Sequence, residues 1–195
     1  SDLLMVDEDD RVTGILGKKE KRVSWYSNLV NAGLFIVQRE VLDEISEPRK
    51  TDWEQEVVQK LIPDGRVFGY RTSEYIKDAG TPDRFRKSSY EHRSGLWGRK
   101  NLKHKQKCVF LDRDGTVNKL AGLIDNPDQL ELYETAAEAI RILNASGMLT
   151  ILATNQPVVA RGMCSEEDVR QIHRKLETLL GQEGAYLDDI VFCPH

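Results

Sequence analysis

The chain has 195 residues, enough for one large domain or two small ones. Its hydrophobic share of 39% and charged share of 31% are typical of a soluble globular protein. No run approaches the roughly 20 apolar residues that span a membrane, and no signal-peptide pattern opens the chain, so we expect no membrane partner. The three cysteines are an odd number without the spacing of a disulfide framework, which favours a reducing, cytoplasmic location.

The net charge of −4 is distributed unevenly along the chain. Residues 1–107 hold 21 Lys and Arg against 18 Asp and Glu, whereas residues 108–195 hold 7 against 14. Between the two parts lies the segment 84–107, with nine Lys and Arg and a single acid. Such a segment could bind nucleic acid, but a solvated linker or exposed helix end is commoner, and no nucleic-acid-binding fold accompanies it. We therefore predict a domain boundary near residue 100 and no nucleic-acid partner.

The N-terminal part alternates between strand and helix patterns. The sequence "DWEQEVVQKLI" is amphipathic, and "DAGTPDRF" ends in a Gly-Thr-Pro turn followed by a helix. In chain order we expect a strand (11–17), a strand and a helix (29–45), a helix (52–62), a strand (65–72) and a turn leading into a helix (73–85).

Two stretches, "NLVNAGLFIV" and "EYIKDAGTP", resemble the second half of the sugar-phosphate nucleotidyltransferases, which make nucleotide sugars. The resemblance implies that Asn31 and Gly33 contact a sugar and that Asp78 binds Mg²⁺ beside the nucleotide phosphates. Without it, Asp78 would be interpreted as a turn-forming residue. The family's Glu-Lys-Pro element is replaced by "LGKKEK" (16–21), which leaves the roles of Lys18 and Glu20 open.

The C-terminal part has the pattern of a parallel, Rossmann-like α/β sheet. Short apolar runs favour buried strands, and apolar residues at helical spacing favour amphipathic helices between them. Ser165 and Asp168 resemble a capping box that begins the second helix. The expected order is a strand (108–111), a helix (133–147), a strand (148–154), a helix after Ser165 and a strand (189–193).

Polar residues follow the first two of these strands, and they suggest phosphoryl chemistry. Asp112 and Asp114 come directly after one strand, and Thr154 and Asn155 end the next. In open α/β sheets these carboxyl ends meet at one edge, where ligands bind. Two acids there need a cation, and Mg²⁺ suits oxygen ligands and phosphate substrates. An isolated D-x-D-G sequence would be interpreted as a turn, but the flanking strands argue against this.

The stretches "FLDRDGTVN" and "ATNQPVVARG" and the final "CPH" resemble the haloacid dehalogenase superfamily of phosphatases. The similarity is greatest to the branch that acts on D-glycero-D-manno-heptose 1,7-bisphosphate or histidinol phosphate. It implies Asp112 as nucleophile through an aspartyl-phosphate, and Asp114 as general acid/base and as Mg²⁺ ligand through its backbone. The residues that it assigns to phosphate or substrate are Thr116, Thr154, Asn155 and Arg161.

Cys193 and His195 resemble the first half of that branch's structural zinc loop, and the other two ligands would lie beyond residue 195. The resemblance also implies a lysine and a further acid past this point. We therefore expect zinc only in a longer parent protein. His173, on the second helix, is interpreted as a half-buried helix residue.

The sequence thus predicts the middle of a bifunctional enzyme: a nucleotidyltransferase half (1–83), a basic linker (84–107) and a truncated phosphatase (108–195). Heptose 1,7-bisphosphate is the preferred sugar phosphate, because removing its 7-phosphate leaves a 1-phosphate that can be activated to a nucleotide sugar. Histidinol phosphate is an alternative substrate. A catalytically incomplete chain that only binds Mg²⁺, phosphate or a partner is an alternative of another class. The oligomeric state remains open.

Overall fold

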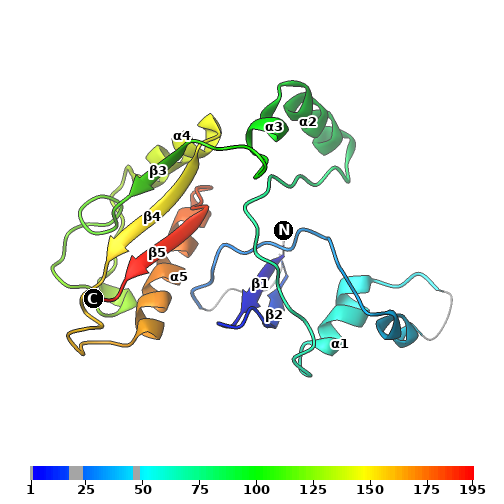
Figure 1. The fold of residues 1–195 in the computed structure, drawn as a ribbon, viewed down its shortest axis with the longest axis horizontal. Helices are drawn as coiled ribbons and strands as arrows, with labels where there is room; N and C mark the ends of the chain where they lie inside the picture. The colour runs from blue at the N-terminus through cyan, green and yellow to red at the C-terminus, as the bar shows by residue number, and fades with distance from the viewer. Residues whose placement is uncertain (1, 18–23, 46–48) are drawn as a thin grey trace. The chain divides into compact units, whose positions relative to one another are not determined.

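The computed structural model describes residues 2–17, 24–45 and 49–195 (Figure 1). The chain forms two compact units, residues 1–72 and 73–195. The predicted boundaries after residues 83 and 107 fall inside the second unit, so the three-part division stays a prediction. Lys18 and Glu20 lie outside the described residues. In the part that the structure describes, no helix is long and apolar enough to cross a membrane.

The first unit contains one antiparallel hairpin and a short helical segment. Strands β1 (Leu3–Val6) and β2 (Val12–Leu16) pair with each other, and β2 confirms the predicted strand at 11–17. The predicted helix at 52–62 appears as a π-helical turn (Glu54–Val58) that continues into α1 (Gln59–Leu61). A small core packs this helical segment against Val41, and it is formed by Val41, Val57 and Leu61 with Trp53 and Val67 against it.

The strands predicted within 29–45 and 65–72 were wrong. Among the described residues these segments form only isolated bridges, Leu3–Val30 and Arg11–Phe68. The helix predicted in the first segment is a 3-10 helix, Arg39–Glu44. An apolar run becomes a strand only where a neighbouring strand accepts its backbone hydrogen bonds. Phe35 of this run packs edge-on against Trp53, but Ile36 beside it is 99% exposed, and among the described residues no strand pairs with the run.

The second unit is built on the predicted parallel sheet, in the order β3-β4-β5 (Figure 1). Its strands are β3 (Cys108–Leu111), β4 (Leu149–Asn155) and β5 (Asp189–Cys193), joined by helices α4 (Ala136–Ser146) and α5 (Glu166–Gln182). Each element matches its predicted position. Because both crossovers run in one direction along the sheet, the right-handed rule places both helices on the same face. The main core lies there and includes Leu152, Ile140, Ile172, Leu176 and Leu180.

The segment 84–107, predicted to be a linker, contains helices α2 (Pro82–Arg93) and α3 (Leu96–Arg99). Helix α2 confirms the helix expected after the Gly-Thr-Pro turn, and the side chain of Thr81 caps it. Lys100 Nζ hydrogen-bonds Tyr186 Oη at 3.2 Å and lies 5.1 Å from the centre of the Tyr75 ring. This basic segment is therefore attached to the sheet domain through Lys100.

Helix α5 begins at the predicted capping box. The Ser165 hydroxyl accepts a hydrogen bond from Asp168 N at 3.2 Å, and Asp168 Oδ2 accepts one from Ser165 N at 2.8 Å. We expect Ser165→Ala to lower the free energy of unfolding by about 1 kcal/mol, because it leaves an N-terminal amide without its acceptor. Urea denaturation would measure this loss. Gln182→Ala, at the exposed end of the same helix, serves as the control, and an equal change in both variants would contradict the prediction.

Candidate active site at the carboxyl edge of the sheet

The chain turns sharply after β3 and presents Asp112 to solvent. The carbonyl of Arg113 accepts hydrogen bonds from Val117 N at 2.9 Å and Asn118 N at 3.1 Å, which closes the loop. Gly115 provides the positive φ, 80°, that this turn requires. Asp112 Oδ1 accepts only the short-range bond from Arg113 N, at 2.7 Å, among the hydrogen bonds found for it. The Asp112 carboxylate is therefore exposed and available as a nucleophile or ligand.

Asp114, two residues on, is held by a cluster of buried donors. Arg113 Nη2 lies 2.9 Å from its Oδ2, Asn118 Nδ2 3.0 Å from Oδ1, and Gln156 Nε2 2.9 Å from Oδ2. These three donors are 0%, 0% and 2% exposed. Burial by itself would raise the pKa of Asp114, but the hydrogen bonds from Asn118 and Gln156 and the charge of Arg113 outweigh it. Its pKa is lowered, and the carboxylate is ionised at neutral pH.

The end of β4 meets the same cluster. Gln156 Nε2 also donates to the buried Thr154 Oγ1 at 2.9 Å, so one amide joins Asp114 to the Thr154 hydroxyl. Asn155, the last residue of β4, is exposed beside them. The structure thus brings together the predicted residues of the two strand ends. Thr116 and Arg161 are exposed on the loops that follow β3 and β4, and no side-chain bond links either to the cluster among the hydrogen bonds found.

Sequence reasoning missed Arg113 and Asn118, and it gave Gln156 no role. A charged residue between two acids is expected at the surface, yet Arg113 is fully buried. The available signal was charge balance, because an acid held at a buried strand end needs a donor nearby. Asn118, four residues after Asp114, lies within reach of it once the loop closes.

His173 of α5 is more buried than predicted, at 5% exposure. Burial, and secondarily the charge of Arg113, lower its pKa from 6.5 to about 3. Between pH 3 and pH 6.5 the unfolded chain binds more protons than the folded chain. The stabilisation that comes from neutral His173 is therefore fully present above pH 6.5 and is lost as the pH drops.

We expect the free energy of unfolding to fall by roughly 1.4 kcal/mol through His173 when the pH drops from 7.5 to 5.5. His173→Gln removes this component, because glutamine does not titrate. Urea denaturation of both proteins at several pH values would measure it. The same dependence on pH in wild type and variant would contradict the prediction.

Cys193 ends β5 beside the end of β4, where its carbonyl accepts a hydrogen bond from Gln156 N at 2.7 Å. Cys193 Sγ and His195 Nδ1 are 3.9 Å apart, and no group of three or more His, Cys, Asp or Glu suited to a metal is found among the described residues. In the first unit Asn31 Oδ1 accepts a bond from Gly33 N at 2.9 Å. In the second unit Asp78 Oδ1 accepts one from Gly80 N at 2.7 Å, and its other oxygen pairs with Arg84.

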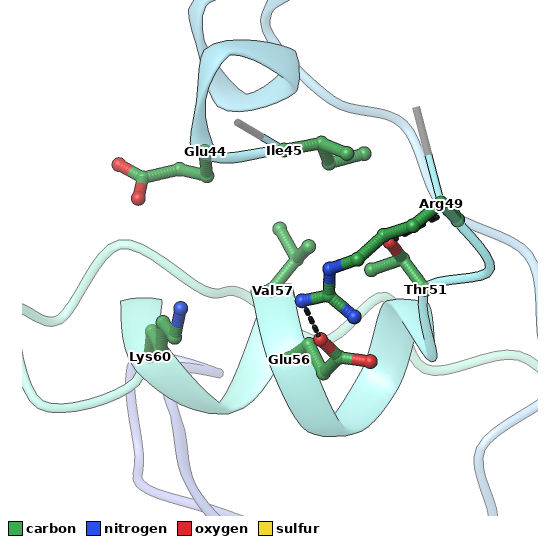
Figure 2. A pocket seen from close by; sticks show the side chains of 7 residues that line it. All are labelled: Glu44, Ile45, Arg49, Thr51, Glu56, Val57 and Lys60. Carbon is green, nitrogen blue, oxygen red and sulfur yellow. Dashed lines mark hydrogen bonds and ion pairs between the residues drawn. The ribbon is translucent and has the colours of Figure 1, made fainter. Parts of the chain in front are cut away.

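Two hollows have walls that include none of these residues. Figure 2 shows the first, a cavity in the first unit where Arg49 pairs with Glu56 and the wall includes Val57 and Lys60. The volume of this cavity is about 50 Å³. Its volume suits a few water molecules and not a sugar phosphate. A groove of about 540 Å³ lies between α4 and α5, and four glutamates on its walls outnumber Arg141 and Lys175, which disfavours an anionic ligand. These glutamates are Glu131, Glu134, Glu138 and Glu183.

The donors at the edge of the sheet suit Mg²⁺. The Asp114 carboxylate is already occupied by Arg113, Asn118 and Gln156, so a metal would be held by the exposed Asp112 carboxylate and the Asp114 backbone carbonyl, with waters completing its shell. When bound, Mg²⁺ would offset the repulsion between the Asp112 carboxylate and an incoming phosphate.

The chain was compared with known proteins, and no family model matches it. It is 46% identical over 88 residues to the D-glycero-beta-D-manno-heptose-1,7-bisphosphate 7-phosphatase of Rhodopseudomonas palustris, covering 45% of this chain and 49% of that protein. It is 40% identical over 90 residues to the enzyme of the same name from Pasteurella multocida, covering 46% and 49%. Both of these relatives are named phosphatases. The chain spans about half the length of the curated relatives that it matches.

The chain is also similar in part to a solved structure. The D,D-heptose 1,7-bisphosphate phosphatase from B. bronchiseptica, complexed with magnesium and phosphate, is 36% identical, with a TM-score of 0.44. The match covers 46% of this chain and 50% of that structure.

Proposed function

We propose that this chain is part of a Mg²⁺-dependent phosphatase that acts on D-glycero-D-manno-heptose 1,7-bisphosphate through an aspartyl-phosphate at Asp112. The observation that carries the proposal is an exposed Asp112 carboxylate beside a buried, hydrogen-bonded Asp114, at the sheet edge where α/β proteins bind ligands. The similarity to proteins named heptose-bisphosphate phosphatases supports the choice of substrate.

In the first step an Asp112 oxygen attacks phosphorus, and the bond from phosphorus to the sugar oxygen breaks. In the second step water attacks the aspartyl-phosphate, releases phosphate and restores Asp112. The lowered pKa of Asp114 suits the second step, because an ionised carboxylate can accept the proton of the attacking water. To protonate the leaving sugar oxygen in the first step, Asp114 must take up a proton against the hydrogen bonds that stabilise its ionised form. Thr154 and Asn155 donate hydrogen bonds to the phosphoryl oxygens.

Phosphate release tests the proposal. Heptose 1,7-bisphosphate and histidinol phosphate would each be assayed with Mg²⁺ and with EDTA. Mg²⁺-dependent release from the heptose substrate is expected, and faster release from histidinol phosphate would favour the alternative substrate. In parallel, ¹⁹F NMR with Mg²⁺ and beryllofluoride would report an adduct that mimics the aspartyl-phosphate. An adduct without turnover would identify a chain that binds phosphate at an incomplete catalytic site. The absence of both the adduct and phosphate release would refute the proposal.

For residues 1–83 we propose the second half of a nucleotidyltransferase that activates the sugar 1-phosphate left by the phosphatase. Asn31 supports this, because its Nδ2 donates to Glu54 at 2.9 Å while its Oδ1 fixes the Gly33 amide, so the loop is ordered. Asp78 would need to leave Arg84 before it could bind a metal. Loss of sugar 1-phosphate binding in Asn31→Ala, measured by calorimetry, is the expected result, and unchanged binding would contradict it.

We also propose that Cys193 and His195 supply two of four zinc ligands in a longer parent protein. The distance of 3.9 Å between Sγ and Nδ1 suits two donors of one tetrahedral ion. Zinc bound by the parent and lost in its Cys193→Ser variant would support this assignment.

A further inference from the structure

Arg113 uses only part of its guanidinium on Asp114. Its Nε and Nη2 donate to Asp114 Oδ1 at 3.2 and 3.1 Å, and Nη2 also donates to Oδ2 at 2.9 Å. The other nitrogen, Nη1, is buried without a hydrogen-bond partner among the described protein atoms. Because a buried charged donor without an acceptor is costly, Nη1 needs an acceptor on the side away from Asp114.

The His173 ring can supply such an acceptor. Its Nε2 is also buried without a partner among the described protein atoms, and its ring packs edge-on against Phe192 of β5, with 5.4 Å between ring centres. A buried imidazole within the field of a permanent guanidinium charge is neutral, and one of its nitrogens then carries a lone pair. A buried donor and a buried acceptor are thus both present, and the charge of Arg113 acts on the His173 ring. One water molecule that bridges the two nitrogens would satisfy both.

We propose that Arg113, anchored by His173, is the positioning residue that orients the Asp114 carboxylate for phosphoryl transfer. The inference rests on the proposed function and deepens it. Asn118 and Gln156 each give Asp114 a single hydrogen bond, whereas the two-point contact with the planar guanidinium fixes the plane of the carboxylate. Through His173 and Arg113, helix α5 thereby helps to fix the Asp114 carboxylate at the edge of the sheet.

Paired substitutions test the anchoring. Arg113→Met removes the contact and Arg113→Lys keeps only the charge, while His173→Met removes the acceptor and His173→Gln retains one. We expect Arg113→Met to lower kcat for phosphate release about 100-fold with KM nearly unchanged, because a misplaced catalytic group loses rate rather than binding. His173→Met should lower kcat roughly 10-fold, and His173→Gln should recover most of it. Arg141→Met, at an exposed arginine of α4, is the matched control.

A loss confined to KM, or equal losses in the two His173 variants, would overturn the proposal. A second measurement works without turnover and also covers variants that fold poorly. In ¹⁵N NMR of the wild-type chain, His173 should carry its proton on Nδ1 with a bare Nε2, and the Nε2 signal should shift in Arg113→Lys. A proton on Nε2, or no shift, would overturn the anchoring. If the wild type neither forms the beryllofluoride adduct nor releases phosphate, the proposed function fails, and this spectrum still decides whether Arg113 and His173 are paired.

Discussion

Asp112→Asn is expected to abolish phosphate release, with a fall in kcat of at least ~10³-fold. The amide has nearly the shape of the carboxylate but cannot form the aspartyl-phosphate, so the reaction loses its covalent route. Because Asp112 is exposed and accepts only the short-range bond from Arg113 N among the hydrogen bonds found, the substitution should leave the fold intact. Circular dichroism and urea denaturation would confirm that the variant is folded.

Asp189→Asn is the matched control, since Asp189 is an exposed aspartate at the amino end of β5, at the opposite edge of the sheet. It should retain wild-type phosphate release. The beryllofluoride adduct should disappear in Asp112→Asn and persist in Asp189→Asn. Turnover by Asp112→Asn near the wild-type rate would exclude Asp112 as the nucleophile, and turnover lost equally in both variants would indicate a general effect on the protein.

The second unit could be predicted from the sequence because its local signals agree with its fold. Short apolar runs alternate with helical patterns, and Ser165 marks a helix start that the structure confirms. Every predicted strand there has a parallel neighbour that accepts its hydrogen bonds. The run around Ile36 has equally apolar residues but no such neighbour, so local pattern alone gave the wrong result.

The candidate site could be predicted from the sequence only in part. Asp112, Asp114 and Thr154 could be located because they end strands, and strand ends meet at an edge. The cluster that buries Arg113 also needs Gln156, which lies 42 residues after Asp114 and donates to it, and this is a tertiary contact that residue type does not encode. The domain limits and the assignment of residues 1–83 remain predictions, since the compared relatives cover less than half of the chain.

Leu152→Ala is expected to lower the free energy of unfolding by about 2–5 kcal/mol. Leu152 is the centre of β4, is 0% exposed and packs in the core under α4 and α5. Alanine would leave a cavity between the central strand and both helices. Against a typical total of about 5–15 kcal/mol for a domain, this loss is large enough to appear as partial unfolding at 37 °C. Urea denaturation followed by circular dichroism would measure it.

Ile151→Ala is the matched control, one residue earlier in the same strand. Successive side chains of a strand face opposite sides, so Ile151 lies on the face away from the helices, where neighbouring Phe110 and Val191 are 66% and 47% exposed. A half-buried side chain has fewer contacts to lose, and the expected cost is well below that of Leu152→Ala. Parallel sheets are normally covered on both faces. An equal cost in the two variants would therefore mean that this second face is also covered in solution, by another part of the protein or by a second copy.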